Sequence, residues 1–333
     1  MDQALASCPV EYRYAPAHFR RAPSIVAETV YVVGGLYGNL EALHEILRMC
    51  EGEAREGRRV ALAFNGDHNW FDVDAASFRE INQLALDSTS IRGNVEAEIA
   101  RPTGGCGCNY PGYVNAEYVA RSNAIMARLQ EAADEFPAVK TALGGLPLTR
   151  TLEVGGERIG VVHGDAELLS GWSFAAERLS PNRRCCSGDE ATAELTPRAR
   201  IEQVFREADV TAFASTHTCL AHARDFAVDG RNRLIMNNGS AGIPNFSGAT
   251  FGLVTRISAD PAVPRASLYG IRMGGARFDA LPVRFDQSAW MKRFLGNWQP
   301  GTPGYDAYFD RLVKGPDFRL ADAIGGRVER ASA

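Results

Sequence analysis

The chain has 333 residues, a formal net charge of −4 and a pI near 5.9, with 45% hydrophobic and 23% charged residues. This composition is typical of a soluble globular protein with a sizeable core. The sequence contains no basic block and no apolar run of membrane-spanning length, so neither a nucleic acid nor a membrane is an expected partner. Residues 1–3 lack the features of a signal peptide, which makes a cytoplasmic location the expectation, and the sequence indicates no oligomeric state.

The first third of the chain alternates strand-like and helix-like patterns. Residues 1–26 carry prolines and arginines without apolar periodicity and predict an irregular N-terminal arm. A β-branched and aromatic run at 29–33 predicts a buried strand, and a glycine-rich turn and an amphipathic helix over 40–50 follow it. The pattern repeats with a strand, a helix and a strand at 59–64, 74–86 and 88–92. Such repeats are typical of βαβ units with a parallel sheet.

The rest of the chain is richer in strand patterns. Two loops separate the elements, a Gly, Pro and Cys-rich loop at 101–113 and a polar loop near 180–194. Predicted helices lie at 115–135, 137–144, 196–208, 286–296 and 305–314. Predicted strands lie at 148–154, 157–163, 210–214, 223–228, 233–237, 250–257, 266–273 and 277–284.

This order of elements predicts a four-layer α/β/β/α sandwich. Parallel units come first and mostly antiparallel strands come later, which indicates two mixed sheets packed face to face with helices outside. We expect a single domain over 27–285, because the candidate ligands described below come from both of its halves. Residues 286–333 are expected to form a helical extension packed on that domain.

Four short polar motifs each follow a strand-like apolar run, at the point where the strand should end. They are Asn65-Gly66-Asp67, Arg92-Gly93-Asn94, Val162-His163-Gly164 and Thr216-His217-Thr218. Open α/β sheets bind their ligands at the carboxyl ends of strands. One carboxylate, one carboxamide and two imidazoles suit a divalent ion such as Mn, Fe, Zn or Ni. The alternative for the carboxylate and the carboxamide is helix capping or turn formation.

These motifs resemble the blocks of the calcineurin-like metallophosphoesterase superfamily over residues 28–257. The blocks of that family read roughly Asp-x-His, Gly-Asp, Gly-Asn-His-Asp/Glu, His-Gly and Gly-His-Thr-His, each at the end of a strand. Here they read Gly35-Leu36-Tyr37, Gly66-Asp67, Gly93-Asn94-Val95-Glu96, His163-Gly164 and Thr216-His217-Thr218-Cys219. No single block is specific, but five blocks in order imply the fold of that family and its activity on phosphate esters.

The resemblance implies that one of the two metals of the family is retained. The residues that only the first metal would use are replaced by Gly35, Tyr37 and Cys219. The four ligands of the second metal are all present, as Asp67, Asn94, His163 and His217. Because every replaced ligand belongs to the first metal, we expect one divalent ion at the second position and a first position that is lost or rebuilt.

Three residues are candidates for catalysis. Val95 replaces the proton-donating histidine of the family, so His68 is a candidate general acid, because an imidazole titrates near neutral pH. Tyr37 could donate a hydrogen bond to a substrate oxygen, or its ring could fill the volume that a metal left. Arg92 could bind a phosphate with two hydrogen bonds, or it could be a solvent-exposed residue at the end of its strand.

Two other polar residues are candidates for substrate binding. Asn39 lies in the turn facing the site, and Asp165 follows His163-Gly164 and could orient an imidazole. Trp70 and Trp172 could form an aromatic wall, although packing in the core is the commoner use of tryptophan.

The cysteines offer a second ion or a redox pair. Cys219 replaces a metal-binding histidine of the family, and Cys106 and Cys108 follow the third block on a loop that could reach the site. Three thiols near Tyr37 could hold a zinc or iron ion, although a one-residue spacing is not the usual zinc motif. The alternatives are three unligated thiols, or a disulfide from Cys106 or Cys108 to Cys219.

The sequence therefore predicts a metal-dependent hydrolase of small-molecule phosphoesters with a mononuclear or rebuilt metal site. Two other classes stay open. One is a metal-dependent enzyme of other chemistry, because two histidines and one carboxylate also suit mononuclear iron. The other is a non-catalytic metal-binding protein on the same fold.

Overall fold

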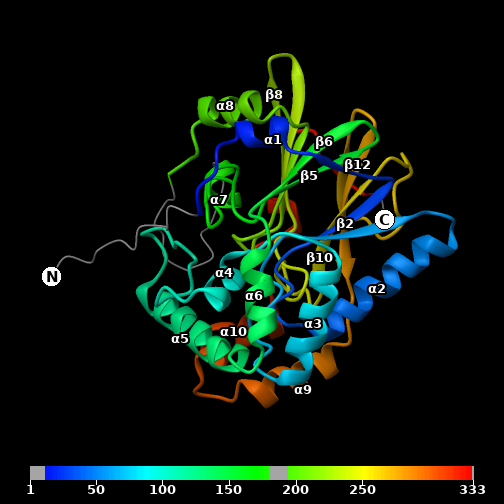
Figure 1. The fold of residues 1–333 in the computed structure, drawn as a ribbon. Helices are drawn as coiled ribbons and strands as arrows, with labels where there is room; N and C mark the ends of the chain where they lie inside the picture. Colours follow the sequence, from blue (N-terminus) through cyan, green and yellow to red (C-terminus); the bar gives the residue numbers. More distant parts are fainter. Residues whose placement is uncertain (1–11, 181–193, 332–333) are drawn as a thin grey trace.

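The structure is a computed structural model that describes residues 12–180 and 194–331, so most of the expected polar loop near 180–194 lies outside the described residues. Two seven-stranded sheets form its centre (Figure 1). The strand order is β1-β5-β6-β7-β9-β8-β13 in one, called here the β6 sheet, and β14-β11-β12-β10-β2-β3-β4 in the other, the β2 sheet. Both are mixed sheets flanked by helices, which confirms the predicted sandwich.

The β2 sheet begins with the predicted βαβ repeats. Its parallel strands are β2 (Thr29–Val33), β3 (Val60–Phe64) and β4 (Thr89–Ser90), and the connecting helices are α2 (Leu40–Arg55) and α3 (Ala75–Asp87). The sheet continues through the antiparallel strands β10 (Gly252–Ser258), β12 (Ala276–Val283), β11 (Tyr269–Met273) and β14 (Glu329–Arg330). Strands from the two ends of the chain therefore share one sheet.

The β6 sheet contains the predicted hairpin and the strands that follow it. The hairpin is β5 (Arg150–Val154) and β6 (Glu157–Val161), and beyond it lie β7 (Ala212–Ser215), β9 (Arg231–Asn237), β8 (His222–Val228) and β13 (Ile324–Gly325). The N-terminal segment differs from the expected irregular arm. Its residues form α1 (Ala17–Arg21) and β1 (Ser24–Ala27), and β1 adds to the sheet edge in parallel with β5.

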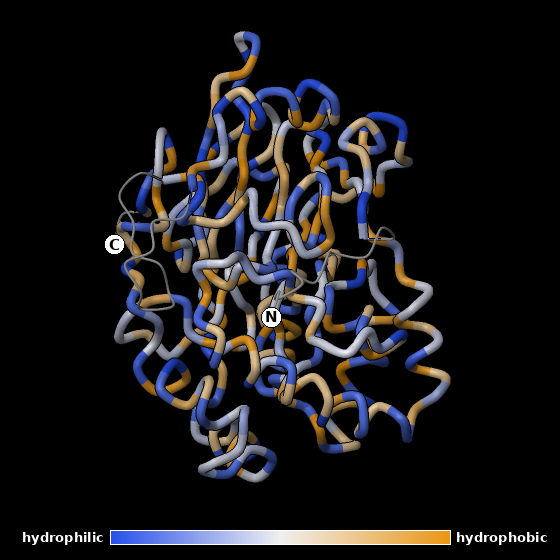
Figure 2. Tube along the Cα trace, turned by 90° about the vertical axis from the view of Figure 1, so that its left-hand side faces the viewer, coloured by the Kyte–Doolittle hydropathy of each residue, from blue (hydrophilic) through white to orange (hydrophobic). Residues whose placement is uncertain are grey.

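Alternation along the strands builds the layers. Val30 and Val32 of β2 face the β6 sheet, whereas Tyr31 and Val33 pack against the cluster that includes α2 and α3. On the far side of the β6 sheet, Phe213 packs under α1 and α8 (Arg198–Ala208). Figure 1 shows α8 and α1 at the top and α2 and α3 at the lower right. Figure 2 shows hydrophobic stretches along the central strands and hydrophilic stretches at many outer turns.

Further helices gather below the sheets, at the end where the site lies. They are α4 (Asn94–Ala100), α5 (Ala116–Ala133), α6 (Pro137–Gly145), α9 (Gln287–Asn297) and α10 (Pro303–Lys314), with the short α7 (Ala176–Leu179) and α11 (Leu320–Ala323) elsewhere. The C-terminal α10 packs along α5. Within the described ranges, no helix combines the length and the apolar character needed to cross a membrane.

Candidate metal centre

The four predicted ligands meet at the carboxyl ends of strands from both sheets. Asp67 and Asn94 follow β3 and β4 of the β2 sheet, and His163 and His217 follow β6 and β7 of the β6 sheet. All four are buried, with at most 6% of any one exposed. Gly66 allows this convergence, because its φ is +96° and a Cβ there would lie 2.5 Å from the backbone nitrogen of Gly93.

The ligand atoms lie at the spacing that one ion requires. The Nε2 atom of His163 is 3.0 Å from Oδ1 of Asn94, 3.1 Å from Nδ1 of His217 and 3.3 Å from Oδ1 of Asp67. Atoms bound at about 2.1 Å to one ion are about 3.0 to 3.4 Å apart in octahedral or tetrahedral geometry. Asp67, His163 and His217 also form a group whose donor atoms all lie within 4.8 Å of one another.

Backbone carbonyls fix which nitrogen of each imidazole carries the proton. Nδ1 of His163 lies 2.9 Å from the carbonyl of Asn65, and Nε2 of His217 lies 3.1 Å from the carbonyl of Cys108. A carbonyl only accepts, so each of these nitrogens must be the N–H donor. The other nitrogen of each ring, which faces the centre, therefore presents a lone pair, as a metal ligand must.

The amide and the carboxylate also turn lone pairs inward. Nδ2 of Asn94 donates to the carbonyl of Cys106 at 2.8 Å, which leaves Oδ1 facing Nε2 of His163. Oδ1 of Asp67 accepts from the backbone N–H of Val95 at 3.3 Å and also faces that nitrogen. Four acceptor atoms thus converge with no hydrogen between them. Such a cluster is repulsive by itself and fits a cation.

Burial shifts the pKa values of these groups. It lowers the pKa of His163 to about 4, and burial, with the neighbouring His163, lowers the pKa of His217 well below its usual value. Both imidazoles are therefore neutral at pH 7. Burial, followed by the charge of Glu96, raises the pKa of Asp67. A cation among these atoms would compensate for the desolvation of that carboxylate.

Glu96 is a positioning residue that the motif search did not single out. Its buried carboxylate accepts backbone N–H groups from Asp67 at 2.8 Å, His68 at 2.9 Å and Gly93 at 2.8 Å. Burial raises the pKa of Glu96, but the charge of His68 and these N–H donors lower it by more, so the pKa of Glu96 lies below its usual value. Glu96 therefore holds the β3 turn, which carries Asp67, against the start of α4, which carries Asn94.

Tyr37 and Cys219, which stand where the resembled family has ligands of its first metal, contact each other. The hydroxyl of Tyr37 lies 2.6 Å from Sγ of Cys219, and both side chains line the cavity described below. Gly35 has φ +61°, and a Cβ there would lie 3.2 Å from Cα of Ser240. A carboxylate at Gly35 would be strained and crowded, which agrees with its absence from this chain.

A cavity of about 450 Å³ opens beside the centre. Asp67, Asn94 and His217 line it, together with side chains from α5 and from the C-terminal α10, including Tyr118, Tyr308 and Arg311. Sequence reasoning missed these residues, because α5 lies between the third and fourth motifs and α10 lies beyond the fifth. Trp70 and Trp172, which the sequence offered as an aromatic wall, both line the cavity.

Two of the three predicted catalytic residues do not line this cavity. His68 is fully buried against Phe64, at a ring distance of 5.7 Å, and within the described residues neither ring nitrogen has a hydrogen-bond partner. Arg92 donates to the carbonyl of Gly144 at 3.0 Å, on α6. The structure therefore corrects the expectation that His68 protonates a substrate and the expectation that Arg92 clamps a phosphate. Tyr37 does line the cavity, and its catalytic role stays a prediction.

The two predicted substrate-binding residues have structural contacts instead. Asn39 caps α2 by accepting from Ala42 N at 2.9 Å and donates to the carbonyl of Gly242 at 2.7 Å. Asp165 accepts backbone N–H groups within its own loop, from residues 167, 168 and 173, and the imidazole of His163 is oriented by Asn65 instead. Neither is among the residues around the cavity in the described part of the chain, which corrects that expectation.

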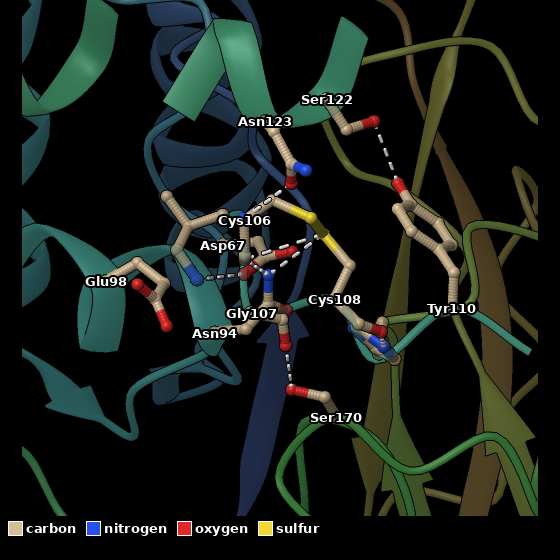
Figure 3. The surroundings of a disulfide bond; sticks show 12 residues. Asp67, Asn94, Glu98, Cys106, Gly107, Cys108, Tyr110, Ser122, Asn123 and Ser170 are labelled. Carbon is tan, nitrogen blue, oxygen red and sulfur yellow. Dashed lines mark hydrogen bonds between the residues drawn. A yellow bond between two sulfur atoms is a disulfide. The ribbon is translucent and has the colours of Figure 1, made fainter. Parts of the chain in front are cut away.

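The three cysteines do not gather into a thiol site. Cys106 and Cys108 form a disulfide with each other (Figure 3). Cys219 forms no disulfide with another described residue, and it contacts Tyr37. This corrects both the expected ion held by three thiols and the expected bond to Cys219. Figure 3 shows Asn94 beside the disulfide, with its amide directed at the loop. The loop serves the centre through the carbonyls of Cys106 and Cys108.

Comparisons with known proteins agree with this fold. No protein-family model matches the chain, and a comparison with curated proteins found no match. The structure is similar to that of a hypothetical protein, PH1004, from Pyrococcus horikoshii OT3, with a TM-score of 0.57 and 16% identity over 88% of this chain and 100% of that one. It is also similar to a metallophosphoesterase from Sphaerobacter thermophilus, with a TM-score of 0.51 and 16% identity over 87% and 99%. The chain therefore has the fold of the calcineurin-like metallophosphoesterase superfamily, as its motifs predicted.

Proposed function

We propose that the protein is a metal-dependent hydrolase of small-molecule phosphate esters with one divalent ion, of the Mn, Fe, Zn or Ni type. The observation that carries this proposal is the convergence of four lone pairs from Asp67, Asn94, His163 and His217 on one point beside a cavity. A single ion is proposed because Tyr37 and Cys219 stand where the resembled family has ligands of its first metal, and the two side chains contact each other.

An ion held by these residues would supply Lewis-acid chemistry, activating water and neutralising charge on a phosphoryl oxygen. The chain itself supplies the other contacts. Burial, followed by the neighbouring Cys219, raises the pKa of Tyr37, so its hydroxyl stays protonated and can donate to a phosphoryl oxygen. Arg311 lines the same cavity and offers a fixed positive charge beside Cys219, which stands where the resembled family has a ligand of its first metal.

The test begins with protein purified without chelator. Metal per chain is measured by mass spectrometry, and hydrolysis of 4-nitrophenyl phosphate and bis(4-nitrophenyl) phosphate is assayed for the wild type and Asp67→Asn. We expect one ion per chain and a loss of hydrolysis of about 100-fold or more in the variant, because its ligand set is incomplete. Asp74→Asn, which alters the cap of α3 outside the cavity, is the matched control and should retain both properties.

Two results would overturn the proposal. Bound iron with oxygen-dependent turnover and no hydrolysis would assign oxidative chemistry to the two-histidine, one-carboxylate group. An ion bound in full occupancy with no turnover of either ester would assign a non-catalytic role.

A further inference from the structure

A continuous wall of aromatic rings leads away from the candidate metal centre. The ring of His217 lies 5.3 Å from that of Trp172, which lies 5.8 Å from Tyr110. Tyr110 lies 5.9 Å from Tyr118, and Tyr118 lies 5.9 Å from Tyr308 on α10. All five residues line the cavity, so the wall begins at a metal ligand and continues along the space where the rest of a substrate would lie.

Hydrogen bonds hold the rings nearest the centre in place. Nε1 of Trp172 donates to the carbonyl of Cys108 at 3.0 Å, and that same carbonyl accepts from His217. The hydroxyl of Tyr110 lies 3.1 Å from Oγ of Ser122 on α5. The polar ends of both rings are thereby satisfied and their faces are fixed. A surface that is already ordered loses little entropy when a ligand packs on it.

The charged side chains at the exposed edge of the cavity neutralise one another. Arg121 pairs with Glu117 at 2.5 Å and Lys314 pairs with Asp310 at 3.0 Å, each one helical turn apart. Each pair has no net charge, so neither pair adds a net positive potential that would attract a second phosphate. The cavity therefore suits a ligand whose negative charge is confined to the phosphate at the metal centre.

We propose that the cavity binds phosphate esters whose alcohol part carries a planar aromatic ring, with that ring packed against Tyr110 and Tyr118. This proposal rests on the proposed function for the phosphate end of the ligand. The cavity volume of about 450 Å³ is within the usual range for small-molecule sites and larger than a phosphate group alone needs. Aromatic rings prefer offset or edge-to-face contact with other rings, which the Tyr110, Tyr118 and Trp172 wall provides.

The test compares two phosphonates that cannot be hydrolysed, (2-naphthylmethyl)phosphonate and (cyclohexylmethyl)phosphonate, by calorimetric titration of the Mn²⁺-loaded protein. We expect the naphthyl compound to bind at least roughly tenfold more tightly in the wild type. Tyr118→Leu should reduce this ratio to below about threefold, and Tyr118→Phe, which keeps the ring, should retain it. Tyr305→Leu is the matched control, because Tyr305 lies on α10 but stacks on Phe309, and neither residue lines the cavity.

Each outcome separates this proposal from the proposed function. Equal affinity of the two phosphonates in the wild type, or an unchanged ratio in Tyr118→Leu, would overturn the aromatic site. Turnover of the corresponding phosphate monoesters, whose leaving groups are both simple alcohols, then reports on hydrolysis independently. Ring-selective binding without turnover supports the site and contradicts the hydrolase, whereas turnover without ring selectivity contradicts only the site.

Discussion

Arg311 donates a hydrogen bond to the backbone carbonyl of Cys219 at 2.7 Å, which ties the C-terminal α10 to the loop that carries His217. The same guanidinium also donates to the carbonyl of Pro244, at 3.2 Å. The C-terminal segment therefore holds the loop that carries His217, and its cation lines the cavity beside the candidate centre.

We expect Arg311→Met to lower kcat/KM for phosphate esters by about 100- to 1000-fold, because a preorganised cation beside developing charge is removed. Metal content should stay at the wild-type value, because Arg311 donates to the backbone carbonyls of Cys219 and Pro244. Steady-state kinetics and metal analysis check this. Arg293→Met removes an arginine from α9, where it pairs with Glu41 outside the cavity, and should leave kcat/KM unchanged. An equal loss in both variants would show a general structural effect instead.

Glu96→Gln should weaken metal binding by about 10- to 100-fold, because an amide keeps only one of the two acceptor oxygens, Oε2 for the Asp67 and Gly93 N–H groups and Oε1 for that of His68. It should also lower the free energy of unfolding by about 1 to 3 kcal/mol. Glu53→Gln is the control, because that partly buried carboxylate accepts hydrogen bonds from Tyr31 and Arg256, away from the ligand group. It should lower stability and leave metal affinity unchanged, as measured by chelator competition and urea denaturation.

The double variant Cys106→Ser, Cys108→Ser should keep one ion per chain, with affinity within about threefold of the wild type, because the loop contacts Asn94 and His217 through carbonyls. Gly107→Ala should weaken binding by about tenfold. Gly107 has φ +64°, and an added Cβ would lie 2.9 Å from Cγ of a neighbouring glutamate, so the carbonyls must move. Loss of the ion in the serine variant would instead indicate sulfur ligation.

The sequence indicated which four side chains converge but not the cavity beside them, for a physical reason. Asp67 and His163 each follow an apolar run at a strand end, and a parallel strand aims its carboxyl end at the site of any α/β sheet, so local pattern locates them. Tyr118 and Arg311 come from helices whose periodicity shows which face is buried but not which other helix covers it. The sequence does not distinguish a helix-capping asparagine such as Asn39, or an arginine that bonds a neighbouring helix such as Arg92, from a residue that binds substrate.

Metal binding should stabilise the fold. At a free metal concentration of 100 times the dissociation constant, an ion that binds only the folded state adds about 2.7 kcal/mol, or roughly 5 °C in Tm for a chain of this size. Asp67→Asn should abolish this shift. In the metal-free state the same variant should be at least as stable as the wild type, because it removes a carboxylate whose burial is unfavourable. Calorimetric scans with Mn²⁺ and with chelator check both expectations, and a metal-free variant that melts earlier would contradict the second.

His222 should make stability depend on pH outside the site. It is fully buried and donates through Nε2 to the carbonyl of Phe174 at 2.7 Å. Burial, followed by the charge of Arg224, lowers its pKa from 6.5 to about 3. The unfolded chain therefore binds a proton that the folded chain does not bind between these values. The contribution of neutral His222 to the free energy of unfolding is fully present above pH 6.5 and is lost as the pH falls towards 3.

Between pH 7.5 and 5.5 this histidine alone should lower the free energy of unfolding by about 1.4 kcal/mol. His163, with a pKa near 4, and His217 act in the same direction, so the measurement uses the difference between two proteins. In His222→Gln, whose amide can still donate to Phe174, the decrease between these pH values should be smaller than in the wild type by about that amount. Urea denaturation in chelator at both pH values tests this. Parallel decreases in the two proteins would show that His222 takes up its proton in the folded state at an ordinary pKa.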